Sequence, residues 1–501
     1  MDLSLNVPQS DWLFGIILFS GLTGLIVTAE IFYVRFAISK ENIRKLVHVL
    51  SGVAVLSTPL IFETYYALLV ISALFTIVNL VSVAKNMLNS YNATERKSLG
   101  TVYYPISVIL LTLLFWHDQT EIFYISFALL AFADAAAGFV GKSAPPASNL
   151  SLPWDKKSRR GAVSMFLMSF TIILAGISIA HNTFQLPVLF IFMTAVSIAL
   201  LVTAGELLSL RGSDNLSIPL LAAMALSVIQ QPERINQFFI GVPLALIIAL
   251  AARRLNALDL SGALATFILG VIIFGYAGWL YTIPILFFFL ASSTLSHLPN
   301  KNNLSCDKTT EPGAKRNVNQ VLANGLAPLA CIMISFVAPH NYLYIFYLAA
   351  LASATADTWA TEIGLMSKTP PRSITSWKSI EPGMSGGITM LGIFGALAGA
   401  GLVTIVGYLA SLKFAPVPLT LVEMTSIIVA GLLAQFVDSL FGAMWQRKNR
   451  CVSCGKITER NWHCKLRTAH FRGKSWLNND AVNLICGFSG LFFIILFHLI
   501  S

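Results

Sequence analysis

Long runs of apolar residues recur along the whole chain, separated by short polar connections. A helix needs about 20 apolar residues to cross the ~30 Å hydrocarbon core of a membrane, and about 16 runs come near that length. The pattern therefore predicts an all-α, polytopic integral membrane protein. The expected spans are 12–32, 46–62, 65–84, 100–116, 120–141, 161–180, 184–207, 216–230, 236–251, 262–277, 280–296, 318–338, 342–364, 386–411, 420–445 and 480–499.

The composition agrees with this prediction. Hydrophobic residues make up 56% and charged residues 11% of the 501 residues, whereas a soluble domain carries roughly 25% charged residues. The chain has too little polar surface to coat a water-soluble globule of its size. We therefore exclude a soluble fold and expect the protein to lie in a lipid bilayer.

The net charge of +10 reflects where the basic residues lie. If the N-terminus is outside, all lysines and arginines except Arg234 and Lys413 fall in every second connection. Basic residues concentrate in the cytoplasmic loops of membrane proteins, so the charge indicates topology, and we reject a nucleic-acid partner. An even number of spans places the C-terminus outside as well. We expect a multi-pass protein of a bacterial inner membrane whose active sites face the cytoplasm.

The connection at 251–259 is the best boundary between two halves, 1–250 and 251–501. Each half holds enough spans for its own helical bundle. The halves also share an order of features: an acid late in a helix, a basic loop with glycine, a second acid, and an Asp/Asn pair that opens a span. A distant duplication explains this order, and so does chance similarity between membrane helices.

Four acidic residues lie inside predicted spans, within about one to two turns of a cytoplasmic end. They are Asp134, Glu206, Asp357 and Asp438. A carboxylate inside a membrane costs ~2.5–3.5 kcal/mol, and pairing with a nearby cation explains one such acid as well as a site does. Four acids at the same depth, each beside a basic loop, favour catalysis of phosphoryl transfer, in which acids hold Mg²⁺ and cations bind phosphate.

A glycine-rich segment, Pro382-Gly-Met-Ser-Gly-Gly387, leads into a predicted span. Glycines let backbone N–H groups approach an anion at a helix start, although a flexible turn is the alternative.

Glu362 points ~140° away from Asp357 on an ideal helix, so one metal does not easily take both. The segment Gly138-Phe-Val-Gly-Lys-Ser143 resembles the end of a P-loop, but no first glycine and no strand precede it, which excludes a soluble P-loop kinase.

Polar residues open two other spans. Arg44, Lys45 and His48 start the second span. Basic residues at such a place commonly set the topology and contact lipid headgroups, and phosphate binding is the alternative. Gln320 and Asn324 start a span in the second half. Amides in a membrane helix bond a neighbouring helix or, alternatively, read a base or sugar.

Six cysteines are present, four of them in or beside predicted cytoplasmic loops, where thiols stay reduced, so we do not expect a disulfide framework. The loop at 446–478 has the spacing of half a zinc site. His470 competes with His463 as a ligand, because adjacent residues seldom both bind one metal. The sequence predicts either a structural Zn²⁺ or free thiols here, and neither makes the loop a reaction centre. The candidate ligands are Cys451, Cys454, His463 and Cys464.

Four motifs occur in order in the first half: Arg44-Lys45-x-x-His48, Ala133-Asp134-x-x-Ala-x-x-x-Gly-Lys142, Lys157-Ser-Arg-Arg-Gly161 and Glu206-x-x-Ser-x-Arg211-Gly-x-Asp214-Asn215-x-x-x-Pro219. Over 40–230 this half resembles the phytol kinase/dolichol kinase family. Phytol kinases usually carry Glu-Gly after the Lys-Ser pair, where this chain has Arg159-Arg160-Gly161.

Five motifs follow in the second half: Arg316-Asn-x-x-Gln320-Val-Leu-Ala-Asn324-Gly, Ala356-Asp357-Thr-Trp-Ala-Thr-Glu362-x-Gly, Pro382-Gly-x-Ser-Gly-Gly387, Asp438-Ser-x-x-Gly442 and Asn479-Asp480-Ala-Val-Asn483. From 255 to 501 the chain resembles the membrane family that contains plant phytyl-phosphate kinase.

Both resemblances imply Mg²⁺-dependent phosphoryl transfer with CTP, or another nucleoside triphosphate, as the donor. The implied Mg²⁺ ligands are Asp134, Glu206, Asp214, Asp357, Glu362, Asp438 and Asp480. The implied substrate or nucleotide contacts are Arg44, Lys45, His48, Lys142, Lys157, Arg211, Asn215, Gln320, Asn324, Lys378, Gly383, Ser385, Gly386, Gly387, Asn479 and Asn483.

Together the resemblances imply a bifunctional enzyme. The first half would phosphorylate an isoprenoid alcohol such as phytol, geranylgeraniol or farnesol, and the second would convert the isoprenyl monophosphate to a diphosphate, as in isoprenoid salvage. One alternative is a cytidylyltransferase acting on a lipid phosphate, which needs similar acids and metals. Another is a transporter of an anionic lipid-linked substrate, whose polar residues would lie near the midplane rather than near one face.

Overall fold

The computed structural model describes residues 7–36, 40–85, 98–145, 149–150, 152, 157–296 and 315–500. The chain forms two compact units, Met1–Phe239 and Ile240–Ser501, which we call unit 1 and unit 2. The division falls inside helix α13 (Pro232–Arg254), the helix that also contains the boundary expected from the sequence. Each unit is described by itself.

Thirteen helices in the described ranges are long and apolar enough to cross a membrane, which confirms the predicted polytopic all-α class. Each expected span overlaps one or more of the helices. Three of these helices fall outside the thirteen. Helices α6 (Gly100–Phe115) and α12 (Asp214–Ile229) are shorter, and α18 (Tyr342–Gly364) is long enough but is not among the thirteen.

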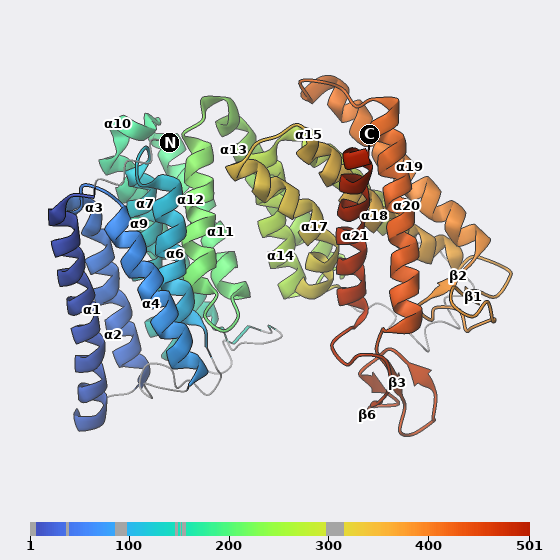
Figure 1. Ribbon diagram of the computed structural model, residues 1–501, viewed down its shortest axis with the longest axis horizontal. Helices are drawn as coiled ribbons and strands as arrows, with labels where there is room; N and C mark the ends of the chain where they lie inside the picture. The colour runs from blue at the N-terminus through green and yellow to red at the C-terminus, as the bar shows by residue number, and fades with distance from the viewer. Residues whose placement is uncertain are drawn as a thin grey trace. The chain divides into compact units, whose positions relative to one another are not determined.

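Unit 1 is a bundle of helices, coloured blue to green in Figure 1. Helix α9 packs against α8 and α11, and α4 packs against α6. Gly52 of α2 lies so close to Ala131 that a side chain at this position would overlap it. The other elements of unit 1 are α1 (Gln9–Phe36), α2 (Lys40–Leu56), α3 (Thr58–Ile61), α4 (Tyr66–Ala84), α7 (Thr120–Ala128), η1 (Leu129–Ala133), α8 (Asp134–Lys142), α9 (Arg159–Ile179), α10 (His181–Phe184) and α11 (Val188–Leu208).

In unit 2, helix α18 is the central element and packs against α15, α17, α19, α20 and α21. Small residues let the backbones approach closely, as is common between membrane helices. Gly431 of α20 lies against Ala352, and Gly490 of α21 lies against Ser353, where any side chain would collide. The helices are α14 (Leu260–Gly270), the π-helical η3 (Val271–Ala277), α15 (Trp279–Ser296), α17 (Val318–Val337), α19 (Met390–Phe414), α20 (Leu421–Met444) and α21 (Asn479–Ile500).

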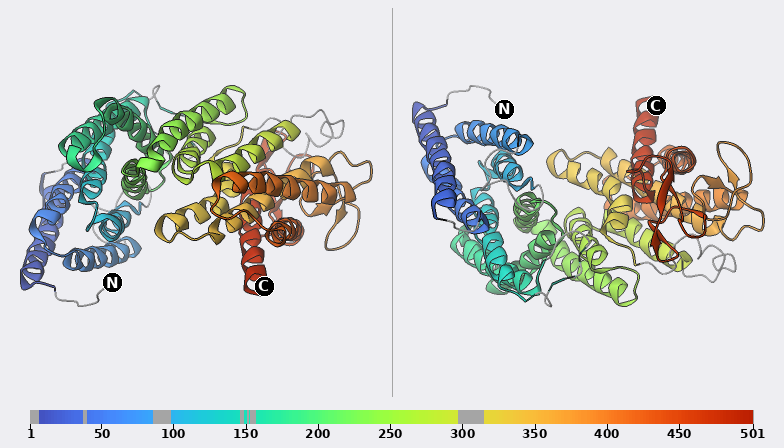
Figure 2. Two further views of the ribbon diagram at one scale, coloured as in Figure 1. Left: turned by 90° about the horizontal axis from the view of Figure 1, so that it is seen from above. Right: turned by 90° about the horizontal axis from the view of Figure 1, so that it is seen from below.

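Residues 446–478, the Cys-bearing loop, contain short strands between α20 and α21. Strand β3 (Lys448–Arg450) pairs antiparallel with β4 (Ile457–Thr458) and β7 (Ala469–Arg472). Strands β5 (Trp462–His463) and β6 (Leu466–Arg467) form a hairpin. The loop extends beyond the ends of α20 and α21 (Figure 1) and lies across them when seen from below (Figure 2, right).

The expected span at 386–411 begins later than predicted. Gly387 and Ile388 form strand β2, which pairs with β1 (Arg372–Ser373), and α19 starts at Met390. The Thr389 hydroxyl oxygen accepts a hydrogen bond from the backbone N–H of Gly392 and caps this helix. The glycine-rich segment is therefore a separate loop and not the first turn of the helix.

Candidate functional site

A lysine and two acids from three segments of unit 1 meet at one end of the bundle. Lys157 lies just before α9, Glu206 near the end of α11, and Asp214 begins α12. The Lys157 Nζ atom lies 2.6 Å from Glu206 Oε1 and 3.8 Å from Asp214 Oδ2. Burial lowers the pKa of Lys157, but the attraction of the two carboxylates outweighs burial and raises this pKa above its ordinary value. The lysine therefore stays charged at neutral pH.

Asp134 joins this group from a distorted part of its helix. It follows the π turn η1, a widened turn of the kind often found at functional sites. His48 Nε2 donates a hydrogen bond to the Leu130 carbonyl of this turn at 2.8 Å and lies 3.8 Å from Asp134 Oδ2. Asp134 also interacts electrostatically with Asp214 and Lys157. The unit 1 cluster consists of Asp134, Lys157, Glu206 and Asp214.

A second basic group borders this cluster. The Lys45 ammonium is buried and lies 4.5 Å from the centre of the Phe139 ring. It reaches this place because Gly138 has no side chain; a Cβ there would be 2.7 Å from Lys45 Nζ. Glu41 Oε1 lies 3.6 Å from Lys45 Nζ, and its Oε2 lies 2.8 Å from Lys142 Nζ. Glu41 is not among the residues predicted from the sequence, although its i,i+4 spacing from Lys45 is a readable signal.

Arg44 lies near the unit 1 cluster, whereas the side chain of Asn215 makes a contact within the fold. Arg44 interacts electrostatically with Asp134. The Asn215 side-chain amide donates a hydrogen bond to the Gly100 carbonyl at 2.8 Å, which fixes the start of α6. Arg211 has a left-handed backbone, with φ 53°, and its carbonyl accepts a hydrogen bond from the residue before α6. Asn215 and the Arg211 backbone therefore both hold the start of α6, and the predicted substrate contacts of these residues stay predictions.

In unit 2 the central feature is a pair of half-buried acids on adjacent helices. Asp357 of α18 and Asp438 of α20 are joined by a hydrogen bond between their carboxyl groups. The Asp438 Oδ1 atom is buried and has no hydrogen-bond partner among the described residues. Two carboxyl groups at such close range cannot both be ionised unless a cation compensates them. This pair fits a divalent metal, which prefers carboxylate oxygens.

Glu362 takes no part in this pair. The Ser296 hydroxyl donates a hydrogen bond to Glu362 Oε1 at 2.7 Å, on another side of α18. The structure thus gives Asp357 and Glu362 different partners.

The glycine-rich loop packs on the end of α20. Gly383 and Gly386 have φ of 83° and 86°, which other residues rarely adopt, and Gly386 lies in contact with Ala443. The Ser385 backbone N–H donates a hydrogen bond to Glu459 Oε1 at 3.0 Å, and its hydroxyl donates one to Oε2 at 2.9 Å. The N–H expected to hold a phosphate therefore holds a carboxylate of the Cys-bearing loop.

Glu459 is a second site residue that is not among those predicted from the sequence. Burial raises its pKa, while the hydrogen bonds from Ser385 act in the opposite direction. It also interacts electrostatically with Asp438, so it lies close to the acid pair. No local pattern marks this residue, because its hydrogen-bond partners Ser385 and Gln446 lie 74 and 13 positions away.

Comparison with known proteins places the chain among integral membrane proteins. Residues 243–491 match a family described as "Integral membrane protein DUF92". An uncharacterized membrane protein of Methanocaldococcus jannaschii is 30% identical over 218 residues, which are 43% of this chain and 86% of that protein. The chain belongs to the DUF92 family. No solved structure matches it.

Two plant proteins are also similar to this DUF92 member. Protein PGR of Arabidopsis thaliana is 28% identical over 265 residues, 49% of this chain and 90% of that protein. Phytol kinase 1, chloroplastic, of the same plant is 25% identical over 226 residues, 41% of this chain and 72% of that protein.

The DUF92 region contains amides whose contacts differ from those expected. Asn317 and Gln320 form a capping box at the start of α17, with reciprocal side-chain to backbone hydrogen bonds. Asn324 Nδ2 donates to the Gln320 carbonyl at 3.4 Å. Gln320 is therefore a helix cap in this structure, and its predicted contact with the nucleotide stays a prediction. The Asn-x-x-Gln spacing is a readable capping signal.

Other predicted contacts of unit 2 lie at the surface or at a helix start. Lys378 is exposed on the loop before the glycine-rich segment, where its carbonyl accepts a hydrogen bond from the Ser373 N–H. Asn479 and Asp480 begin α21, and Asn483 lies one turn later. Helix α21 packs against both α18 and α20, which carry the acid pair.

The four predicted zinc ligands do come together, in the Cys-bearing loop. The ligand atoms of Cys451, Cys454, His463 and Cys464 all lie within 4.8 Å of one another. His470, the competing histidine, lies elsewhere: its Nε2 is 2.9 Å from the Gly473 carbonyl oxygen.

Proposed function

We propose that this protein is a membrane phosphotransferase for isoprenoid substrates. Unit 1 would phosphorylate an isoprenoid alcohol, and unit 2 would phosphorylate the resulting monophosphate. The observation that carries the proposal is that each unit buries a group of carboxylates at one end of its bundle, next to cationic or N–H donors. The similarity to a protein named phytol kinase supports an isoprenoid alcohol as the acceptor.

The unit 1 cluster contains more acidic side chains than lysines. This excess of negative charge suits a bound Mg²⁺ ion, which Glu206 and Asp214 would hold. When bound, this ion neutralises charge on the donor phosphates. Lys157 and Lys45 bind phosphate oxygens, and Asp134 orients the alcohol hydroxyl and accepts its proton. The alcohol oxygen bonds to the γ-phosphorus as the bond from that phosphorus to the β–γ bridging oxygen breaks, and the nucleoside diphosphate leaves.

In unit 2 the acceptor is a phosphate oxygen rather than a hydroxyl. A phosphate monoester loses its second proton with a pKa near ~6, so this acceptor is already ionised at neutral pH and needs no general base. Asp357 and Asp438 would hold Mg²⁺. The backbone N–H groups of Gly383 and Gly386 in the glycine-rich loop would bind donor phosphate, while the Ser385 N–H stays on Glu459.

The expected donor is CTP, and the expected orientation places both groups at the cytoplasmic face. The decisive experiment uses the purified protein with Mg²⁺, γ-labelled CTP or ATP, and phytol, geranylgeraniol, farnesol or their monophosphates. The proposal requires label in a prenyl monophosphate and a diphosphate, with release of CDP or ADP. Release of pyrophosphate would identify a cytidylyltransferase instead. Substrate flux in liposomes without nucleotide turnover would identify a transporter.

A further inference from the structure

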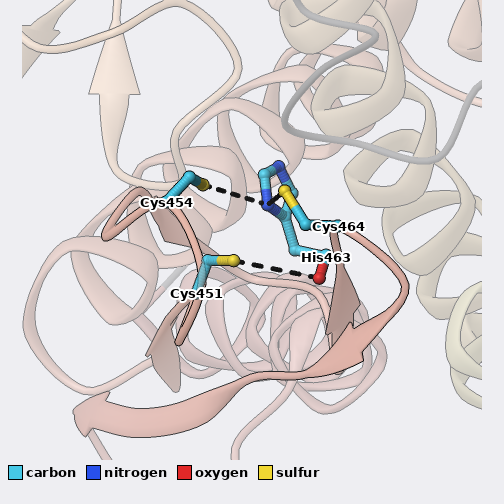
Figure 3. A group of neighbouring side chains, drawn as sticks. All are labelled: Cys451, Cys454, His463 and Cys464. Carbon is cyan, nitrogen blue, oxygen red and sulfur yellow. Dashed lines mark hydrogen bonds between the residues drawn. The ribbon is translucent and has the colours of Figure 1, made fainter.

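The Cys-bearing loop gathers four potential metal ligands that no part of the proposed reaction uses (Figure 3). His463 Nδ1 lies 3.4 Å from the Cys454 sulfur and 3.2 Å from the Cys464 sulfur. Zn–S bonds of about 2.3 Å and Zn–N bonds of about 2.0–2.1 Å place S and N ligands ~3.6 Å apart in a tetrahedron. The observed separations are close to this value.

Two turns present the four side chains. Cys451 and Cys454 lie in the turn between β3 and β4, where Gly455 has φ 70° and its N–H donates a hydrogen bond to the Cys451 carbonyl. Backbone N–H groups of Ser453 and Cys454 also donate to the Cys451 sulfur. Hydrogen bonds of this kind orient a metal-binding thiolate.

The second turn carries an unusual backbone. In the β5–β6 hairpin, Trp462 pairs with Arg467 and His463 with Leu466, which leaves Cys464 and Lys465 as the two central residues. Both have left-handed φ, 51° and 61°, a conformation that hairpin turns normally assign to Asn-Gly. This turn allows the adjacent His463 and Cys464 to point at one place, which removes the objection to two neighbouring ligands.

We propose that Cys451, Cys454, His463 and Cys464 bind one Zn²⁺ ion. Three cysteines and one histidine complete a tetrahedron and leave no open position for a substrate, so the site is structural. The role of the ion follows from the segment of chain that lies between Cys454 and His463. Glu459, which receives two hydrogen bonds from Ser385, lies between Cys454 and His463 in the sequence. The ion fixes both ends of this segment and so holds Glu459 on the glycine-rich loop. This inference does not depend on the proposed function.

The first test measures zinc in protein purified through a tag without histidines. Wild-type protein is expected to contain about one zinc per chain. Cys454→Ser and His463→Gln should lower this to near zero, while Cys331→Ser, in α17, and His470→Gln should retain it. Equal zinc in all five samples, or loss with His470→Gln and not with His463→Gln, would overturn the site. Zinc bound only with micromolar or weaker affinity would show an adventitious ion.

The second test measures hydrogen exchange in intact wild-type protein before and after removal of zinc by a chelator. The Ser385 amide should exchange at least about tenfold faster without zinc, because Glu459 no longer accepts its hydrogen bond. Peptides from the core of α18 serve as the control and should not change. Bound zinc with unchanged exchange at Ser385 would overturn the link to the glycine-rich loop, and acceleration everywhere would show general unfolding instead.

Discussion

Single residues show that the two units compensate their buried acids in different ways. In unit 1, the partner of Glu206 is an ammonium, Lys157, at 2.6 Å. In unit 2, the partner of Asp357 is another carboxyl group, that of Asp438. An acid paired with a lysine can stay ionised without a bound metal ion. Two paired carboxyl groups must instead share a proton or bind a cation. Metal binding in unit 2 is therefore expected to release protons, and metal binding in unit 1 to release fewer.

The two acids Asp134 and Asp357 allow the proposed steps to be separated. Asp134→Asn should abolish phosphorylation of the alcohol while added monophosphate still becomes diphosphate. Asp357→Asn should do the reverse, so that monophosphate accumulates. Each loss should be at least about 100-fold, because positioning and charge stabilisation dominate phosphoryl transfer. Both rates are measured on one preparation by mass-resolved products.

The matched control is the folded state of each variant, followed by size-exclusion profile and thermal unfolding. Parallel loss of both activities in well-folded Asp134→Asn protein would contradict two separate sites. It would instead indicate one composite site that needs both units.

Gly138 provides a probe of Lys45 that leaves the helix intact. A methyl group at Gly138 would displace the flexible end of Lys45, at low cost to the fold. Gly138→Ala should therefore raise the KM for the nucleotide in alcohol phosphorylation by roughly 10-fold or more, since a hydrogen bond to a charged group is worth about 1.5–3 kcal/mol. Gly21→Ala, where a Cβ would meet open space, is the control. An unchanged KM would remove Lys45 from the binding residues.

At the scale of elements, hydrophobic runs identified the helices, because a membrane span must satisfy its backbone internally and present apolar side chains. The same rule says nothing about parts outside the bilayer. The strands of the Cys-bearing loop and strand β2 (Gly387–Ile388) were missed, since two- to four-residue strands depend on pairing across the loop. The π turn before Asp134 was also missed, because it adds one residue without changing the apolar pattern.

The candidate site was partly predictable, because charged residues stand out within apolar spans. Acids inside apolar spans are visible in a sequence, so Asp134, Glu206, Asp357 and Asp438 could be found. Their partners come from distant segments. Glu41 could have been recognised from its i,i+4 spacing to Lys45, whereas no local pattern marks Glu459, whose partner Ser385 is 74 positions away.

The contact between the Cys-bearing loop and the glycine-rich loop can be tested at Glu459. Glu459→Ala removes both hydrogen bonds from Ser385, so the glycine-rich loop should loosen and phosphorylation of the monophosphate should fall about 10-fold or more. Alcohol phosphorylation should not change. Glu381→Ala is the control, because this exposed residue pairs with Lys456 at the surface, an interaction worth about 0–1 kcal/mol. A rise in activity would show that the Glu459 carboxylate competes with the phosphate.

At the scale of the whole molecule, the proposed function requires the active ends of both units to meet the same nucleotide pool. The alternation of basic connections predicts this orientation. Single cysteines introduced at Asn341, between α17 and α18, and at Lys378, between α18 and α19, should be labelled by a membrane-impermeant thiol reagent from opposite sides. Labelling of Asn341 and Lys378 from one side would show that α18 does not cross.

One helix, α13, carries the chain from unit 1 into unit 2 without a break. The two units are therefore always synthesised in equal numbers. In the proposed function, gene expression cannot adjust one step against the other, and the steady-state amount of the intermediate depends on the two turnover numbers alone. A monophosphate with a long apolar tail behaves as a detergent, so a second step faster than the first would protect the bilayer at every level of expression.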